Sequence, residues 1–250
     1  MAPKVSVITP TYARDAFLPG LVACFAAQTY ANLELLILDD SPRPSRHAFT
    51  DPRVRYTHVT ERLTIGEKRN RLIAASSGQV IVHFDDDDYY APGYVEWMLR
   101  QLGDHDLVKL VGWFAYATAL NQYFYWQTDA SMELHYVVSP DATLGATRGS
   151  DLTGNFVRDN AWGYGFSYVY RRELCRDVPF PAMNFGEDFH FFAACAGINK
   201  KLALVNDTEG IVLHVLHRHN TAKIFPQYLL PPFIGRARFP GAAVERVAQL

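Results

Sequence analysis

Apolar and polar residues alternate in blocks along the first 100 residues, and each block has the spacing of a strand or of a helix. Short aliphatic and β-branched runs predict strands at 5–9, where Pro10 ends the run, and at 33–38, 54–59 and 80–84. Apolar positions three and four residues apart predict helices over 17–28 and 66–77, the second ending at Gly78. Nearly all-apolar strands joined by helices indicate a parallel sheet covered on both faces.

The second half has a more aromatic and less regular pattern. The stretch 107–126 is interrupted by the polar residues Lys109, Thr118, Asn121 and Gln122. It is therefore predicted to form two strands, not a membrane helix. No run of 18 apolar residues occurs in the sequence, so no transmembrane segment is predicted. Further strands are predicted over 167–172 and 211–215. The aromatic side chains of 113–126 favour a core or an interface over a sugar-stacking surface.

Composition narrows the class of protein. The chain has 250 residues, of which 49% are hydrophobic, so it can form one large α/β domain or two small ones. Its net charge of -2 gives no overall attraction to nucleic acid or anionic membranes. Three cysteines without a Cys-x-x-Cys pair argue against zinc and a disulfide framework. The start enters a strand without a signal peptide, so we expect a cytoplasmic protein, with peripheral membrane association left open.

Polar clusters follow three of the predicted strands: Thr9-Pro10-Thr11-Tyr12, Asp39-Asp40, and the run Asp85-Asp86-Asp87-Asp88. In open parallel sheets, ligands bind outside the carboxyl ends of the strands. Four neighbouring carboxylates repel one another, and burial would raise their pKa values, so the run suggests a positive partner. Mg2+ and Mn2+ prefer carboxylate oxygens and bridge to diphosphates. The alternative is a solvated acidic turn with Asp88 as a helix cap.

Basic residues crowd the start of the helix that follows Gly66. Lys68, Arg69 and Arg71 oppose the positive end of the helix dipole, which indicates a nearby anion or polar ligand. The alternative is a set of ion pairs with Glu61, Glu67 or the aspartates. Neither GxxxxGK[ST] nor GxGxxG occurs in the sequence, so neither a P-loop nor a dinucleotide-binding fold is supported.

In combination, four segments resemble the nucleotide-binding half of family 2 glycosyltransferases: 5–12, 36–41, 66–70 and 84–89. The segment 185–189 resembles the Glu-Asp motif of that family, and 214–221 resembles its late His-x-x-Asn-Thr segment. The resemblance implies the GT-A fold, a Rossmann-like, mostly parallel sheet with helices on both faces and a smaller mixed acceptor-side region. It implies one domain over 1–222, with a nucleotide-binding half (1–100) and an acceptor half (101–222). Residues 223–250 would form an extension that serves as a lid or an interface.

The resemblance also implies a role for each matched residue on the donor side. Thr9, Pro10, Thr11 and Tyr12 would line the nucleoside pocket. Asp39 would bond the base, commonly uracil, while Lys68 and Arg69 would contact the base or a phosphate. Asp85 and Asp86 would face the ribose and the donor sugar.

The remaining implied roles concern the metal and the acceptor. Asp87 would be the direct ligand of Mn2+ or Mg2+ in the DxD motif of 85–87, a register that the fourth aspartate leaves open by one residue. His217 would approach the metal or the diphosphate, with His214 as the competing choice. Asp188 would be the general base. Trp162 and Glu187 would lie on the acceptor side.

These roles predict an inverting, metal-dependent transfer of a sugar from a nucleotide-diphosphate donor, first of all a UDP-sugar, to an acceptor hydroxyl. A divalent cation stabilises the departing diphosphate, and a carboxylate opposite it takes the acceptor proton. One alternative is a nucleotidyltransferase, although the Gly-rich basic loop expected of that class is absent from 9–14. Another is a catalytically silent sugar-nucleotide-binding protein. The acceptor class and homo-oligomer formation are left open.

Overall fold

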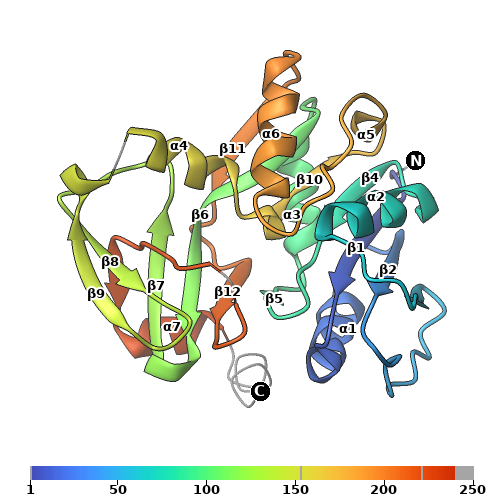
Figure 1. The fold of residues 1–250 in the computed structure, drawn as a ribbon, viewed down its shortest axis with the longest axis horizontal. Helices are drawn as coiled ribbons and strands as arrows, with labels where there is room; N and C mark the ends of the chain where they lie inside the picture. Colours follow the sequence, from blue (N-terminus) through green and yellow to red (C-terminus); the bar gives the residue numbers. More distant parts are fainter. Residues whose placement is uncertain (1, 153, 221, 240–250) are drawn as a thin grey trace.

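The computed structural model describes residues 2–152, 154–220 and 222–239. The first four strands are parallel and lie in the order β4-β1-β2-β3. Their bounds are β1 (Val5–Thr11), β2 (Leu33–Asp39), β3 (Val54–His58) and β4 (Val80–His83). Three helices accompany them: α1 (Leu18–Ala26), α2 (Ile65–Ala75) and α3 (Tyr94–Leu102). The parallel sheet predicted for the first half is therefore confirmed (Figure 1).

Both faces of this sheet are covered because neighbouring residues of a strand point to opposite sides. Val5 and Val7 of β1 pack in the same cluster as residues of α1, such as Phe25. Ile8, on the other face, packs in a second cluster with Leu72 of α2. This explains why the strands are apolar at nearly every position.

Strand β1 continues past Pro10 to Thr11, so the prediction that Pro10 ends this strand is wrong. Its pairing with β4 stops at Ile8, whereas its pairing with β2 runs on to Thr11. At Pro10, β1 therefore has a neighbour on one side alone. A proline, which lacks a backbone N–H, is tolerated at such an edge.

The second half adds strands of both directions to the same sheet. Strand β10 (Val169–Arg171) lies between β4 and β6 (Leu107–Ala117) and runs antiparallel to both. The remaining strands are β5 (Tyr89–Tyr90), β7 (Gln122–Gln127), β11 (Leu202–Asn206), β12 (Val212–Leu216) and β13 (Tyr228–Leu230), with the separate hairpin β8 (Leu134–Val138) and β9 (Leu144–Arg148). Strands β11 and β12 pair parallel with β6, whereas β7 and β10 pair antiparallel with it. The prediction of two strands in 107–126 is confirmed.

The described part of the second half contains two longer helices and two short ones. They are α4 (Gly154–Trp162), α5 (Leu174–Asp177), α6 (Glu187–Gly197) and α7 (Pro232–Arg238). Single 3₁₀ turns occur at Asp15–Phe17, Thr118–Leu120, Gly149–Asp151 and Gly165–Ser167. Within the described ranges, no helix combines the length and the apolar character needed to cross a bilayer.

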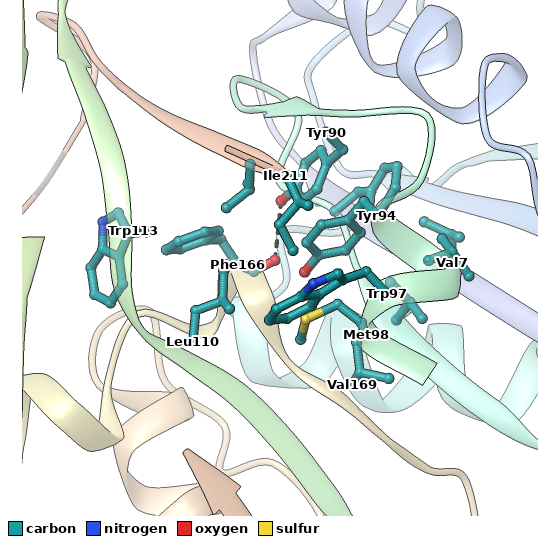
Figure 2. Close-up of a cluster of buried hydrophobic side chains, with 14 of the residues drawn as sticks. Val7, Tyr90, Tyr94, Trp97, Met98, Leu110, Trp113, Phe166, Val169 and Ile211 are labelled. Atoms are coloured by element: carbon teal, nitrogen blue, oxygen red, sulfur yellow. Dashed lines mark hydrogen bonds between the residues drawn. The ribbon is translucent and has the colours of Figure 1, made fainter. Parts of the chain in front are cut away.

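The aromatic residues of the second half form core, as the sequence favoured. Trp113 and Trp126 are buried and pack edge to face with ring centroids 5.3 Å apart. Figure 2 shows Tyr90, Tyr94 and Phe166 in the same cluster. The hydroxyl of Tyr90 accepts a hydrogen bond from the Asp85 amide (2.8 Å) and donates to the carbonyl of Phe166 (3.1 Å). The core therefore fixes the backbone of the first aspartate of the run.

The described part of the extension joins the main sheet. Strand β13 pairs with β7, and Ile224 forms a bridge with Val138 of β8. Thr221 of the His-x-x-Asn-Thr segment and residues 240–250 lie outside the described residues. A lid or interface formed by 223–250 stays a prediction.

One buried carboxylate far from the aspartate run should govern stability in acid. Glu34 of β2 accepts hydrogen bonds from Ser6 Oγ (2.6 Å) and from the Ser77 amide (2.7 Å), and it pairs with Lys4. Burial acts in the opposite direction, but these bonds lower the pKa of Glu34 from 4.5 to about 2. Its stabilisation is therefore complete above about pH 4.5 and is lost as the pH falls through about 2. Glu34→Gln should lower the free energy of unfolding by about 1–3 kcal/mol at pH 7. In urea unfolding measured at several pH values, the stability of this variant should also fall less between about pH 4.5 and pH 2.

A matched control for Glu34→Gln is Glu61→Gln. The Glu61 side chain is 60% exposed and pairs only with the half-exposed Arg71. If acid lowers the stability of Glu34→Gln as strongly as that of the unmodified protein, the assignment to Glu34 is contradicted.

Candidate active site

The four aspartates form a buried turn between β4 and β5, at the carboxyl end of the parallel sheet. Asp86, Asp87 and Asp88 are only 5%, 3% and 2% exposed. Two threonines of β1 support the turn: Thr9 Oγ1 donates to the carbonyl of Phe84 (2.8 Å), and Thr11 Oγ1 donates to Asp86. The burial rules out the alternative of a solvated acidic turn.

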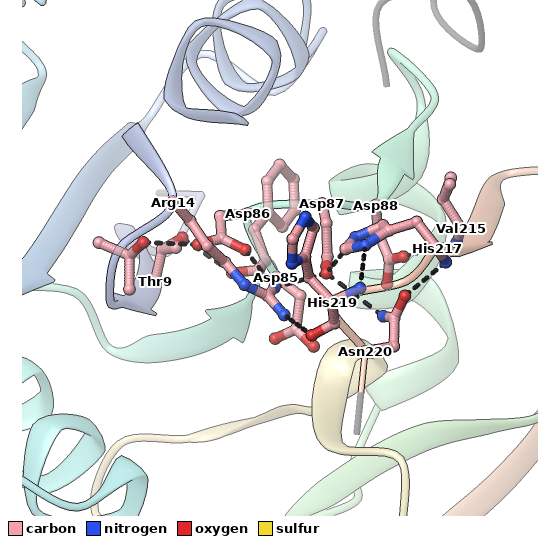
Figure 3. A network of polar contacts seen from close by, with 12 residues as sticks. Thr9, Arg14, Asp85, Asp86, Asp87, Asp88, Val215, His217, His219 and Asn220 are labelled. Carbon is pink, nitrogen blue, oxygen red and sulfur yellow. Dashed lines mark hydrogen bonds and ion pairs between the residues drawn. The ribbon is translucent and has the colours of Figure 1, made fainter. Parts of the chain in front are cut away.

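Arg14, from the loop after β1, is the cation that lies directly against this turn (Figure 3). Its Nη1 bonds Asp86 Oδ1 (2.8 Å) and also Asp87, while its Nη2 donates to the carbonyl of His219 (3.0 Å). Burial opposes the charge, but Asp87 and Asp86 raise the pKa of Arg14 beyond its already high value. Arg14 therefore links the aspartate turn to the loop after β12.

The two competing histidines contact different aspartates. His214 Nδ1 lies 3.0 Å from Asp88 Oδ1, and His217 Nε2 lies 3.0 Å from Asp87 Oδ2. The amide of His219 donates to His217 Nδ1 (3.2 Å), so the ring proton of His217 is on Nε2 and points at Asp87. Which histidine meets a metal stays a prediction, although His217 contacts the aspartate predicted to be the ligand.

Burial disfavours full ionisation of the four carboxylates in this turn. It raises the pKa of Asp85 to about 8, with Arg69 opposing this shift and the other three aspartates adding to it. It also raises the pKa of Asp86 to about 6, with Asp87 adding to the shift and Arg14 opposing it. For Asp87, burial is outweighed by the His217 bond and the Arg14 charge, which lower the pKa to about 2. Carboxylate oxygens of Asp85, Asp87 and Asp88 lie within 4.8 Å of one another. Oxygen donors this close fit a hard divalent cation.

The predicted nucleoside pocket lies beside this turn. Thr11 pairs with Asp39 across β1 and β2. Asp39 accepts hydrogen bonds from the Ser41 amide (2.8 Å) and from the Tyr56 hydroxyl (2.6 Å). Tyr12 is 38% exposed, and the Arg62 guanidinium lies over its ring at 3.4 Å. The structure thus brings Thr9, Pro10, Thr11, Tyr12 and Asp39 together, while their contact with a nucleoside stays a prediction.

The basic residues at the start of α2 all have acidic partners. Lys68 Nζ donates to Asp40 Oδ1 and to the Thr11 carbonyl, both at 2.8 Å. Arg71 pairs with Glu61, as the ion-pair alternative predicted. Arg69 pairs with Glu187, at 2.9 Å from its Nη1 to Oε1.

The buried Lys68–Asp40 pair makes a stability prediction. Lys68 is 2% exposed and the Asp40 side chain is fully buried, so Asp40→Asn leaves a buried cation without its counter-ion. We expect a loss of about 3–5 kcal/mol in urea unfolding. The control Asp104→Asn breaks an exposed pair with Lys201 and should leave the free energy of unfolding nearly unchanged. Equal losses in the two variants would contradict this role of Asp40.

Arg69 keeps hydrogen-bonding capacity that its protein contacts do not use. It is buried, and its Nε and Nη1 have no hydrogen-bond acceptor among the described residues, because the Glu187 contact is an ion pair without hydrogen-bond geometry. Its positive charge acts on Glu187, Asp85 and Asp188. Arg69 therefore connects the aspartate turn with the Glu-Asp pair that opens α6.

Asp188 is half-buried at the first turn of α6 and is held by two amides. Its Oδ2 accepts from the Gly165 amide and its Oδ1 from the Phe189 amide, both at 2.7 Å. Trp162, at the end of α4, stacks on Phe189 with ring centroids 5.9 Å apart. The structure thus brings Asp188, Glu187 and Trp162 together, while their place on the acceptor side stays a prediction.

The sequence of residues 6–177 matches the family described as Glycosyl transferase family 2. The chain belongs to glycosyltransferase family 2. One family relative, the glycosyltransferase GlyG of Streptococcus pneumoniae, is 25% identical over 147 residues, which cover 56% of this chain and 46% of that protein.

Solved structures show the GT-A fold of family 2 in this chain. TarS of S. aureus has a TM-score of 0.57 at 18% identity, covering 85% of this chain and 60% of that chain. The mannosyltransferase PcManGT of Pyrobaculum calidifontis has a TM-score of 0.54 at 18% identity, covering 86% and 57%. The chain thus spans less than two thirds of each of these proteins. The fold predicted from the family 2 resemblance is confirmed.

Two residues of this family 2 site were not singled out from the sequence. Arg14 and Asn220 both contact Asp87, the second through Nδ2 at 3.4 Å. No local pattern marks Arg14, because its partner lies 73 residues away in the sequence, whereas Asn220 is the asparagine of the His-x-x-Asn-Thr segment and could have been found from it.

Proposed function

We propose that this chain transfers a sugar from a nucleotide-diphosphate donor to an acceptor hydroxyl, with inversion and with a divalent cation. A UDP-sugar is the first donor to test. The observation that carries the proposal is Arg69, whose Nη1 lies 2.9 Å from Oε1 of Glu187, the neighbour of Asp188, and whose charge also acts on Asp85. This supports a single site for the aspartate turn and the predicted base. The family match favours this reaction over nucleotidyl transfer.

Asp87, with Asp85 and Asp88 beside it, would hold Mn2+ or Mg2+, and His217 would lie next to the ion. Bound there, the cation would offset the charge of the departing diphosphate. The closeness of the three carboxylates and the raised pKa of Asp85 support this assignment. PcManGT is described in complex with GDP-Man and Mn2+, and TarS in complex with UDP-GlcNAc.

Arg69 and Lys68 would contact the nucleotide, Arg69 through the donors that its protein partners leave unused. Asp39 would bond the base from the neighbouring strand. Asp188 would take the proton of the acceptor hydroxyl, since its two amide bonds fix its orientation while part of its surface stays open to an acceptor. A single base opposite the leaving group gives inversion.

Calorimetric titration tests the donor half of this proposal. UDP, GDP, CDP and ADP, and then their sugars, are titrated with Mn2+ and with EDTA. Metal-dependent binding of one diphosphate would support the proposal and fix the donor class for an acceptor screen. Absence of binding to all four by folded protein would contradict it. Binding without turnover over a broad acceptor screen would favour a silent sugar-nucleotide-binding protein.

A further inference from the structure

Lys109, which interrupts the apolar stretch of 107–126, is a fully buried lysine in the middle of β6. Its side chain is 0% exposed. Among the ion pairs of the described ranges, none includes Lys109. Burial lowers its pKa to about 7, although Asp188 acts against this shift. An ammonium group in such a place is costly unless its donors are used.

The donors of Lys109 are used on the backbone where α4 ends. Nζ donates to the carbonyl of Ala161 (2.6 Å) and to that of Gly163. The hydroxyl of Tyr168 donates to the carbonyl between them, that of Trp162. Three consecutive carbonyls are thus held from inside the protein, in place of the helical bonds that end here.

The segment fixed in this way leads directly to Asp188. Tyr164 has a left-handed backbone (φ 60°), and Gly165 follows with its amide donating to Asp188 Oδ2 (2.7 Å). A Cβ at position 165 would lie 2.9 Å from Asp188 Cβ, so the two residues are as close as a glycine allows. A shift of the 161–165 backbone would therefore move the donor that orients the Asp188 carboxylate.

We propose that Lys109 is a positioning residue for Asp188: by holding the carbonyls of Ala161 and Gly163, it places the Gly165 amide that orients the carboxylate. The inference rests on the proposed role of Asp188 as the base. Lys109 is fully buried, so it would touch neither donor nor acceptor. Its loss should therefore lower kcat and leave nucleotide binding unchanged, whereas a purely structural role would weaken both.

The test compares Lys109→Met with Lys200→Met. Methionine keeps the length and apolar stem of the side chain but donates no hydrogen bond. Lys200 is a matched control because it pairs only with the half-exposed Asp177, away from the 161–165 segment. Tyr168→Phe removes the donor to the Trp162 carbonyl, together with its 3.1 Å bond to the Asp188 carbonyl, with little change of volume. It replaces Lys109→Met if that variant does not fold, with exchange at Gly165 as the readout.

Two measurements decide the proposal, with UDP-GlcNAc and GDP-mannose plus Mn2+ as probes and water as the acceptor. We expect amide hydrogen exchange at Gly165 to rise at least about tenfold in Lys109→Met, and kcat to fall about 10- to 100-fold at unchanged affinity for the nucleotide diphosphate. Unchanged exchange at Gly165 in folded Lys109→Met would overturn the proposal whatever the activity. Unchanged kcat, or an equal loss of nucleotide affinity, would also overturn it.

Failure of the proposed function would look different. In that case the unmodified protein would show no turnover, or Asp188→Asn would keep it, while exchange at Gly165 in Lys109→Met would still report whether Lys109 holds the segment. Loss of turnover in Asp188→Asn together with normal kcat and exchange in Lys109→Met would refute the inference on Lys109 alone.

Discussion

Asp188→Asn should lower kcat by about 100- to 10,000-fold and leave the binding of the nucleotide diphosphate nearly unchanged. Asparagine has the size of aspartate, and its amide oxygen can still accept the hydrogen bond from Gly165, although the bond from the Phe189 amide is lost. It cannot take a proton from the acceptor hydroxyl. Because a base acts only in the transition state, the loss should fall on kcat and kcat/KM together. Steady-state rates and calorimetric titration of the same preparation measure the two effects.

The matched control for this prediction is Asp159→Asn. Asp159 is an exposed carboxylate of α4 whose side chain pairs only with Arg158. Its replacement should change neither turnover nor binding. Near-normal transfer by Asp188→Asn would show that another group accepts the proton.

Asp87→Ala should abolish the metal dependence of nucleotide-diphosphate binding. Loss of a group that merely supports a ligand typically costs 10- to 100-fold in metal affinity, so the loss of a direct ligand should cost at least about 100-fold. Alanine would also leave Arg14 with Asp86 as its remaining aspartate partner at the turn and would free the ring of His217. Titration of the diphosphate with Mn2+ and with EDTA, on protein shown to be folded, measures the effect.

Asp86→Asn is the matched comparison for this prediction. Asp86 bonds Thr11 and Arg14 and lies outside the trio of close carboxylates. We expect Asp86→Asn to keep metal-dependent binding of the nucleotide diphosphate. If Asp87→Ala keeps it and Asp86→Asn loses it, the direct ligand is Asp86.

The donor half was predictable because its determinants are local. A β-branched run, a helical repeat and a polar strand end each lie within a few residues, so the order of β1 to β4 follows from them. The start of α2 was missed by one residue, although Thr64 and Glu67 form a capping box that the sequence displays. The extension of β1 past Pro10 depends on where the pairing of β1 with β4 ends, and no local sequence pattern indicates that position.

The acceptor half was harder because its contacts join distant residues. Glu187 and Asp188 could be identified as a pair from the family resemblance. The Arg69 partner of Glu187 lies far away in the sequence, and the Lys109 bonds span more than 50 residues. The position of a lysine inside an aromatic run does not indicate to which backbone carbonyls it will donate hydrogen bonds. Residues 9–12, 39, 85–88 and 188 were selected as candidates because functional side chains concentrate at strand ends and helix starts, and their roles stay predictions.

The place of β10 has a consequence for synthesis. Strands β4 and β6 face each other across β10, whose residues 169–171 emerge from the ribosome long after both. Until then, each presents an unpaired edge, and unpaired edges invite pairing with other chains. A chain that stops before residue 169 is therefore expected to aggregate, and the first 100 residues should not serve as an independent folding unit.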